Sequence, residues 1–218
     1  MPENIPDINT SVFAHGIKNR LSFIRSKLQL MELENNEKGA FDSIYRELDG
    51  INESVCQLIS APKKTEKTLF NVKDAIYECI LEKLPEANLN GITIRRKLED
   101  NLFVSASEAD FRECIINILK NAVEACPPKG GEIYVSSCFA GDTVEITVSD
   151  NGKGISRKDA KNIFTPFFTT KEKGSGIGLF SCRKFARESG GSLSISGSPG
   201  KGACVKLILP KADCNENT

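Results

Sequence analysis

The sequence predicts an α+β protein in which a helical hairpin precedes an α/β sandwich. First, apolar residues over 9–59 recur every three or four positions, which is the pattern of amphipathic helices. Second, a polar segment broken by Pro62 follows, and such segments are typical of hinges between domains. Third, the remainder groups its strand-like runs apart from its helical ones, which favours a helical layer on a mixed or antiparallel sheet. The predicted domains are the hairpin 1–65, the sandwich 66–213 and a tail, 214–218.

The bulk composition argues against several classes of function. The chain of 218 residues carries 29 Lys and Arg and 29 Asp and Glu, so no net charge draws it to nucleic acid or to an anionic membrane. No apolar run approaches the ~20 residues that cross a bilayer, and the first residues lack a signal-peptide pattern. We therefore predict a cytoplasmic protein that binds no nucleic acid and makes no membrane contact through this chain. The eight cysteines form no CxxC pair and there is one histidine, so we interpret the cysteines as small hydrophobes.

Two amphipathic helices are predicted before the hinge, over 9–33 and 41–59, with Gly39 among the residues that separate them. A hairpin of this size cannot bury both apolar stripes by itself. Pairing with a second copy buries them, so we predict a homodimer joined through an intermolecular four-helix bundle.

The only histidine, His15, lies in an early turn of the first predicted helix. Taken alone, it is most simply a surface or capping residue. Asn19 lies one turn further on the same face, and Lys18 and Arg20 add positive charge nearby. An imidazole in these surroundings could also act as a nucleophile toward a phosphoryl group. Which interpretation holds depends on whether the rest of the chain binds ATP.

The elements of the second domain follow from periodicity and from helix and strand breakers. They are a helix over 69–84 stopped by Pro85, strands over 91–98 and 102–104, a helix over 108–125, a hairpin of strands over 132–139 and 143–149, a helix over 177–189, and strands over 192–196 and 203–209. Ser105 and Ser107 each offer a capping pattern for the helix 108–125.

Two asparagines in the helix 108–125, Asn117 and Asn121, are four residues apart and project from one face. Lys120 and Glu124 flank them. One interpretation is a solvated polar face. The other is a Mg²⁺ site, because this ion takes few protein oxygens and completes its shell with phosphates and water.

The stretch 149–181 contains two glycine clusters. Asp150 precedes the first, Gly152 and Gly154, and the second, over 174–178, comes directly before a predicted helix. Glycines ahead of a helix N-terminus allow the backbone amides to cradle an anion. We therefore predict a nucleotide site under a mobile lid.

Four motifs in this part of the chain resemble those of sensor histidine kinases. They are 117–125, which resembles the N box of that family, 150–154, its G1 box, 163–171, its F box, and 174–179, its G2 box. His15 with Asn19 resembles its H box. The resemblance covers residues 66–213 and implies a Bergerat-type ATP-binding fold for this domain.

The resemblance implies a role in binding ATP and Mg²⁺ for each matched residue. Asn121 would coordinate Mg²⁺, and Asp150 would accept a hydrogen bond from the adenine amino group, which selects adenine over guanine. The other ATP-binding residues that it implies are Asn117, Lys120, Glu124, Gly152, Gly154, Ile155, Thr170, Lys171, Gly174, Ser175, Gly176, Ile177, Gly178 and Leu179.

The activity that the resemblance implies is that of a two-component protein-histidine kinase. His15 would attack the γ-phosphoryl group of ATP, with Asn19, Asn117 and Lys171 contributing to catalysis. The phosphoryl group would then pass to an aspartate of a response-regulator receiver domain. Asn19 also matches the amide with which relatives position water to dephosphorylate that partner, so phosphatase activity is a second expectation.

Three positions depart from the family pattern. Gly16 replaces an acid that polarises the imidazole, Arg20 replaces a proline, and Ala203 replaces a threonine that contacts adenine through water. Gly16 supports an alternative function, a nucleotide-binding dimeric docking platform with weak or no kinase activity. Efficient hydrolysis of ATP by water is not expected, because Asn117 stands where related ATPases carry a glutamate and an amide cannot act as a general base.

Overall fold

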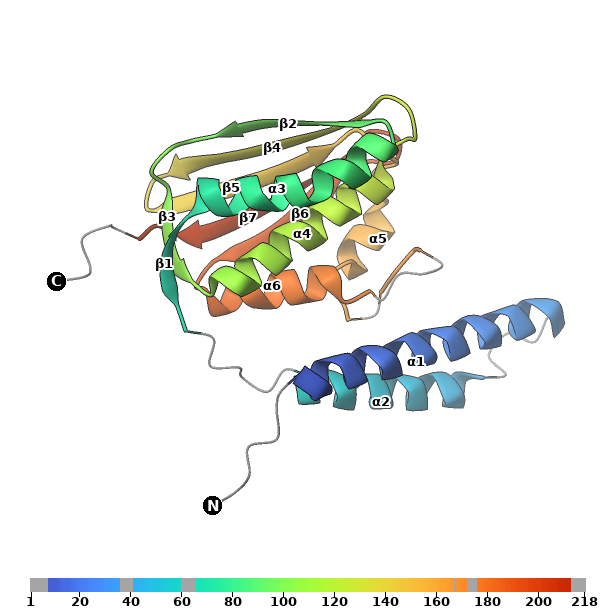
Figure 1. Ribbon diagram of the computed structural model, residues 1–218. Coiled ribbons are helices and arrows are strands. Elements are labelled where there is room, and N and C mark those ends of the chain that lie inside the picture. The colour runs from blue at the N-terminus through green and yellow to red at the C-terminus, as the bar shows by residue number, and fades with distance from the viewer. Residues whose placement is uncertain (1–7, 36–40, 60–65, 167, 172–175, 213–218) are drawn as a thin grey trace, which may run out of the picture. The chain divides into compact units, whose positions relative to one another are not determined.

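A computed structural model of the chain describes residues 8–35, 41–59, 66–166, 168–171 and 176–212 (Figure 1). In the first two of these ranges it describes the side chains of 17, 20–32 and 41–51 only. The chain divides into two compact units, Met1–Thr65 and Glu66–Thr218, and each is described by itself.

The first unit contains the two helices that periodicity predicts, α1 (Ile8–Asn35) and α2 (Asp42–Ile59). α1 continues without a break through Gly16, although glycine weakens a helix by up to ~1 kcal/mol relative to alanine. Of the apolar side chains described here, Leu21 and Leu48 are buried.

Polar contacts join α1 to α2. Arg25 Nη1 lies 2.5 Å from Asp49 Oδ1, and the guanidinium carbon of Arg25 lies 5.3 Å from the centre of the Tyr45 ring. The Tyr45 hydroxyl in turn donates a hydrogen bond of 3.3 Å to Glu32 Oε2. The four-helix bundle, which needs a second copy of the chain, stays a prediction.

The second unit is a two-layer α+β sandwich built on a mixed sheet, as predicted. Three helices lie on one face of a five-stranded sheet in the order β2-β4-β5-β7-β6 (Figure 1). β2 and β4 are parallel and the other neighbours are antiparallel. The strands are β2 (Ile92–Leu98), β4 (Gly131–Ala140), β5 (Thr143–Asp150), β6 (Ser192–Gly197) and β7 (Ala203–Pro210), and the helices are α3 (Val72–Leu89), α4 (Glu108–Ala125) and α6 (Gly178–Glu188).

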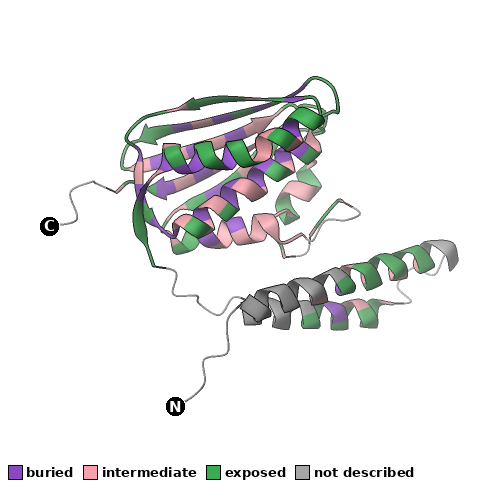
Figure 2. Cartoon of the chain, in the orientation of Figure 1, coloured by how far each residue is buried: buried purple, intermediate pink, exposed green. Residues whose placement is uncertain are grey.

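The core lies between the helices and the sheet, where Figure 2 shows the buried residues concentrated. α4 contributes the stripe that its spacing predicts, with Ile115 and Leu119 fully buried. Its Phe111 ring lies 5.1 Å from the ring of Phe70 and 6.3 Å from that of Phe185. Each such side chain stabilises the fold by about 1.5–3 kcal/mol when it is removed from water. Packing therefore fixes α4 as the central helix of its layer.

The helix predicted over 69–84 is wrong at its start and at its end. Residues 68–71 form a strand, β1 (Thr68–Asn71), which pairs with β3 (Phe103–Ala106), where the sequence predicts a helix from residue 69. These residues form a strand because Phe70 is buried in the core. The helix starts only after them, because the Asn71 side chain caps α3 by accepting the Lys73 N–H at 2.9 Å.

Pro85 does not end α3, which continues to Leu89. Proline removes one backbone hydrogen bond from a helix interior. The last turn is nevertheless held by packing, because Ala87 is completely buried. The helix ends instead at Asn90, followed by Gly91 in a left-handed conformation with φ of 66°.

One helix was not predicted, α5 (Arg157–Asn162), whose N-cap Ser156 accepts the Asp159 N–H at 3.1 Å. The Ser156-x-x-Asp159 spacing carries the signal for it. Among the described cysteines, Cys79, Cys114 and Cys182 are free and buried, as expected of small hydrophobes, whereas Cys126 and Cys204 are half-buried and Cys138 is exposed. Burial raises the pKa of Cys79 to about 11, which suppresses its thiolate.

Over the described part of the chain, no helix has both the length and the hydropathy that a bilayer crossing requires.

Candidate functional site

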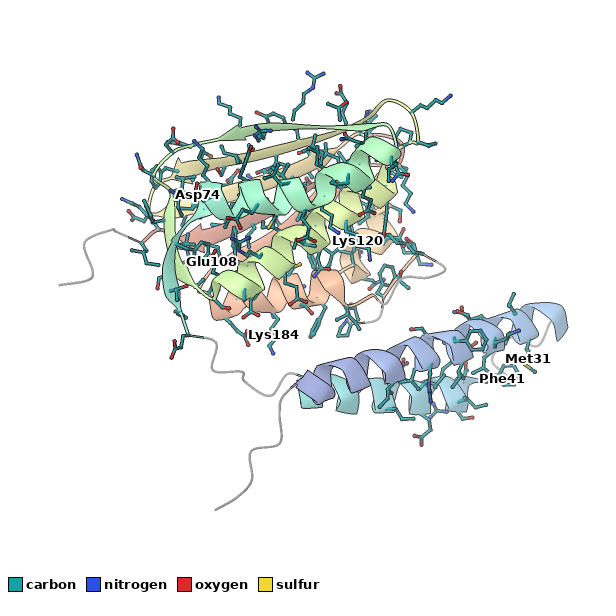
Figure 3. All side chains as sticks on the ribbon, viewed as in Figure 1. Met31, Phe41, Asp74, Glu108, Lys120 and Lys184 are labelled. Atoms are coloured by element: carbon teal, nitrogen blue, oxygen red, sulfur yellow. The ribbon has the colours of Figure 1, made fainter. Side chains whose placement is uncertain are left out.

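The polar face of α4 forms one wall of the candidate site. Asn117 and Asn121 are half-buried on this face, and Lys120 and Glu124 are exposed beside them (Figure 3 labels Lys120). Asn117 lies against the start of α6, since a Cβ atom added to Gly178 would lie 3.2 Å from Asn117 Oδ1. The glycine thus allows α6 to begin close to the amides of α4.

The N-terminus of α6 faces the same region, and among the described residues none accepts a hydrogen bond from its first backbone N–H groups. Its N-cap residue, Ile177, makes no side-chain capping bond, and Gly178 and Leu179 form the first turn. Gly176, just before it, has a φ of 66°, which favours glycine. Uncapped N–H groups together with the helix dipole make a helix start suitable for binding an anion.

Lys171 connects the segment before α6 to α4. Its Nζ donates a hydrogen bond of 2.7 Å to Asn121 Oδ1 and forms an ion pair with Glu124 Oε2. Lys120 Nζ lies 4.0 Å from the other carboxylate oxygen of Glu124. Thr170, next to Lys171, is exposed. Two lysines, an amide and a carboxylate therefore meet at the position where the sequence predicts phosphate and metal.

Asp150 ends β5 at the opposite end of the site. Its Oδ1 accepts hydrogen bonds from the Gly152 N–H at 2.9 Å and from the Ala203 N–H at 3.3 Å. Burial raises the pKa of this carboxyl, and the two N–H donors partly offset the rise. No hydrogen bond from a described residue reaches Oδ2, which remains an acceptor for a ligand donor.

The loop after Asp150 is clamped between α4 and the turn that joins β6 to β7. A Cβ atom on Gly152 would lie 2.3 Å from Ala125 O, and one on Gly154, whose φ is 70°, would lie 1.9 Å from Ser198 O. Ile155, 8% exposed, anchors the end of this loop. Both glycines are therefore required by close backbone packing.

Sequence reasoning missed two residues of this loop and turn, Asn151 and Gly202, and the backbone role of a third, Ala203. Asn151 ties the loop to β4, because its Oδ1 accepts the Glu132 N–H at 2.8 Å and its Nδ2 donates to Gly130 O at 3.0 Å. Gly202, with φ of 72°, lies so close to Asp150 that a Cβ atom added to it would be 1.8 Å from Asp150 O. Ala203 contributes the N–H that Asp150 Oδ1 accepts. The two glycines in the turn 198–202 could have indicated that the backbone at Gly202 packs closely. A backbone donor such as Ala203 leaves no trace in residue type.

Four predicted residues are not brought into this geometry. Gly174 and Ser175 lie outside the described residues. His15 and Asn19 belong to α1 of the first unit, and their side chains lie outside what is described. Of the remaining predicted residues, Asn117 contacts the start of α6, and Asn121 and Glu124 contact Lys171. The end of α4 contacts the loop after Asp150.

The comparison with known families agrees with this geometry. Residues 106–213 match the family described as histidine kinase-, DNA gyrase B-, and HSP90-like ATPases. The second unit belongs to this ATPase family. The family match supports the use of ATP by the second unit.

Relatives extend the similarity beyond the ATPase domain. The chain is 35% identical to sporulation kinase A of Bacillus subtilis (strain 168) over 204 residues, which are 91% of this chain and 33% of that protein. It thus spans about a third of the length of this relative. The chain is also 30% identical to the sensor histidine kinase ZraS of Escherichia coli O157:H7 over 204 residues, which are 90% of this chain and 44% of that protein. These matches confirm the resemblance to sensor histidine kinases.

Solved structures agree in fold. The catalytic domain of the histidine kinase ThkA, in a nucleotide-free form, superposes with a TM-score of 0.62 at 29% identity and covers 67% of this chain and 96% of that chain. ThkA has also been solved in complex with the response regulator protein TrrA. That structure matches with a TM-score of 0.62 at 24% identity over 93% of this chain and 61% of the other, and shows the shared fold alone.

Proposed function

We propose that this chain is the core of a protein-histidine kinase, which phosphorylates His15 from ATP and passes the phosphoryl group to an aspartate of a response-regulator receiver domain. The observation that carries the proposal is the group of polar residues along α4 of an ATPase-family domain, in a chain whose similarity to sporulation kinase A also spans the first unit.

At the adenine end, Asp150 would bind the base through Oδ2. Oδ1 is already engaged by the Gly152 and Ala203 N–H groups, so the carboxylate is fixed in orientation before the ligand arrives. A fixed acceptor favours a base with an amino donor at this position, which adenine has. Gly154 would lie beside the base, as the family resemblance implies, and its lack of a Cβ lets the loop pack against the turn at Ser198.

At the phosphate end, the free N–H groups of α6 and the side chains of Thr170 and Lys171 would bind the phosphates. Asn121 is the proposed metal ligand, with Asn117, Lys120 and Glu124 around it. The residues fit a cation, since the ammonium group of Lys171 already lies between Asn121 Oδ1 and the Glu124 carboxylate. Mg²⁺ would supply charge neutralisation on the phosphates.

The chemical step assigned to the first unit is a phosphoryl transfer. A ring nitrogen of His15 attacks the γ-phosphorus, the bond from that phosphorus to the bridging oxygen of ADP breaks, and phosphohistidine and ADP result. Catalysis rests on positioning and charge neutralisation rather than on a general base. Asn117, an amide, leaves water without a base, so transfer is favoured over hydrolysis. Asn19 is the candidate residue for a phosphatase reaction on the partner.

The exposed apolar side chains of the first unit support a homodimer. On α1, Ile24 and Met31 are 43% and 45% exposed, and on α2, Ile44 and Ile51 are 42% and 45% exposed (Figure 3 labels Met31). Exposed apolar faces of this kind mark interaction surfaces. A second copy that completes a four-helix bundle would cover them.

A labelling experiment separates kinase from docking platform, the alternative that Gly16 favours. The chain is incubated with γ-labelled ATP and Mg²⁺, beside the variants His15→Ala and Asn121→Ala. We expect an acid-labile, base-stable label that both substitutions remove. Nucleotide binding without any label in the natural chain would support the platform and exclude the kinase.

A further inference from the structure

The ammonium group of Lys171 occupies the position that the proposed function gives to a metal ion. Nζ is 2.7 Å from Asn121 Oδ1 and is paired with Glu124 Oε2. Asn121 Oδ1 is also the proposed metal ligand. A lysine ammonium and a divalent cation cannot share one oxygen at such distances, because their charges repel strongly in a partly shielded site.

The arrangement is built by α4 and is partly shielded from water. Asn121 and Glu124 are three residues apart and so lie on the same face of the helix. The side chains of Lys171 and Glu124 are 31% and 35% exposed. The second oxygen of Glu124 faces Lys120 at 4.0 Å, so the carboxylate is paired on both sides.

We propose that Glu124 is a positioning residue that holds Lys171 over Asn121, and that Lys171 leaves for the phosphates only when a divalent cation binds at Asn121. The inference rests on the proposed ATP site and adds a regulation of it. Lys171 and the metal are alternative occupants of one position. The binding of metal and the engagement of phosphate by Lys171 are therefore coupled.

An ordinary surface ion pair would behave differently. Such pairs contribute about 0–1 kcal/mol, and an isolated lysine–carboxylate pair leaves no amide oxygen to complete a cation site once the lysine is removed. The contact between Lys171 and Asn121 Oδ1 predicts instead that removing the ammonium group exposes a cation site made by an amide oxygen and a carboxylate.

The first test is a titration of the full chain with Mn²⁺ alone, followed by electron paramagnetic resonance of the free ion. Lys171→Gln should bind Mn²⁺ about fivefold more tightly than the natural chain, which corresponds to one partly exposed ion pair. Adding Asn121→Ala to Lys171→Gln should remove the gain. Lys158→Gln, an exposed lysine of α5, is the matched control and should leave binding unchanged. Equal Mn²⁺ affinity in Lys171→Gln and the natural chain would overturn the proposal.

The second test does not depend on the stability of a Lys171 variant. Acetylation of lysines is followed by peptide-resolved mass spectrometry without nucleotide. Lys171 should react about fivefold faster in Glu124→Gln, because its partner is lost. In Glu113→Gln, a matched change at an exposed position of α4, its rate should stay unchanged. A rate for Lys171 that does not respond to Glu124→Gln would show that Glu124 does not hold it.

Neither test uses turnover of ATP. A chain that fails to phosphorylate His15 but passes both tests refutes the proposed kinase and leaves the coupling intact. A chain that phosphorylates His15 but fails both tests refutes the coupling alone.

Discussion

Among single residues, Asp150 is proposed to bind adenine and at the same time lowers the stability of the folded chain. Its carboxyl group is partly buried, and burial raises its pKa above the usual 3.8 even though two N–H groups donate to it. A charge held in such a place destabilises the folded chain. The structure therefore retains at this position a carboxylate that folding alone would not favour, as expected for a residue that recognises a ligand.

Asp150→Asn should stabilise the fold and weaken ATP binding. Asparagine keeps the Oδ1 acceptor but removes the buried charge, so the free energy of unfolding at about pH 7 should rise. The natural carboxyl becomes protonated as the pH falls through its raised pKa toward 3.8. The advantage of the variant is therefore full above the raised pKa and is lost on acidification.

Denaturant unfolding of both proteins between about pH 7 and about pH 4 measures this difference. ATP affinity, measured by calorimetry, should fall by at least about tenfold, because a charged acceptor is lost. An asparagine variant that is less stable at neutral pH, or that binds ATP as tightly as the natural chain, would refute this role for Asp150.

Gly154→Ala should destabilise the chain more than Gly141→Ala. Both glycines have positive φ, 70° and 62°, but a Cβ at Gly154 would lie 1.9 Å from Ser198 O, whereas nothing lies within 4 Å of one at Gly141. Backbone strain alone costs about 1 kcal/mol in Gly141→Ala, and the added clash should bring Gly154→Ala to about 3 kcal/mol. Equal losses in thermal unfolding would mean that the loop relaxes freely.

Among the elements, local signals predicted α4 well but misplaced both ends of α3 and missed β1. The bounds of α4, 108–125, match the prediction, because its apolar spacing and its cap agree. β1 was missed since four residues carry too little pattern, and their pairing with 103–106, far along the chain, makes them a strand. Pro85 was overrated as a helix breaker, since packing of the last turn outweighs one lost hydrogen bond.

The residues of the candidate site also divide into those that local sequence patterns predict and those that only the fold brings together. The amides of α4 and the glycine clusters could be found from spacing, because a helix face and a helix start are local features. The pairing of Lys171 with Glu124 joins residues 47 positions apart and could not be found. The backbone donor of Ala203, 53 positions from Asp150, was equally invisible. Contacts of this kind depend on the fold rather than on neighbouring residues.

The start of α4 offers a test at this scale, since two serines compete as its cap. Ser107, not Ser105, accepts the Asp110 N–H, at 3.2 Å, and is 8% exposed. Ser107→Ala should lower the free energy of unfolding by about 1 kcal/mol. Ser105→Ala, at an exposed strand position, should change it by less than about 0.5 kcal/mol. The opposite ranking in urea unfolding would contradict this cap.

For the molecule as a whole, the proposed function gives each of the two units a different role. The second unit would hold ATP along α4, which contacts the loop after Asp150, Lys171 and the start of α6. The first unit would carry the residue to be phosphorylated on a helix that exposes apolar side chains. A dimer that covers those side chains is the assembly we expect.

Ile24→Glu should shift the chain toward the monomer. Ile24 is 43% exposed on α1, and a charge there would be buried in a four-helix bundle. Gln29→Glu adds the same charge at an exposed position outside the predicted apolar stripe and should leave the assembly intact. Light scattering after size-exclusion chromatography gives the mass of each protein. A natural chain that is monomeric would remove the dimer from the proposal.

The most direct measurement of the proposed function is the mapping of phosphoryl groups after the natural chain is incubated with ATP and Mg²⁺. Mass spectrometry under neutral conditions, which preserve phosphohistidine, reports each modified peptide. We predict one modification, on the imidazole of His15, absent when Asp150→Asn or Asn121→Ala is used. Retained ATP binding with no modified histidine, or a phosphoryl group on another residue, would contradict the assignment of this chain as a histidine kinase.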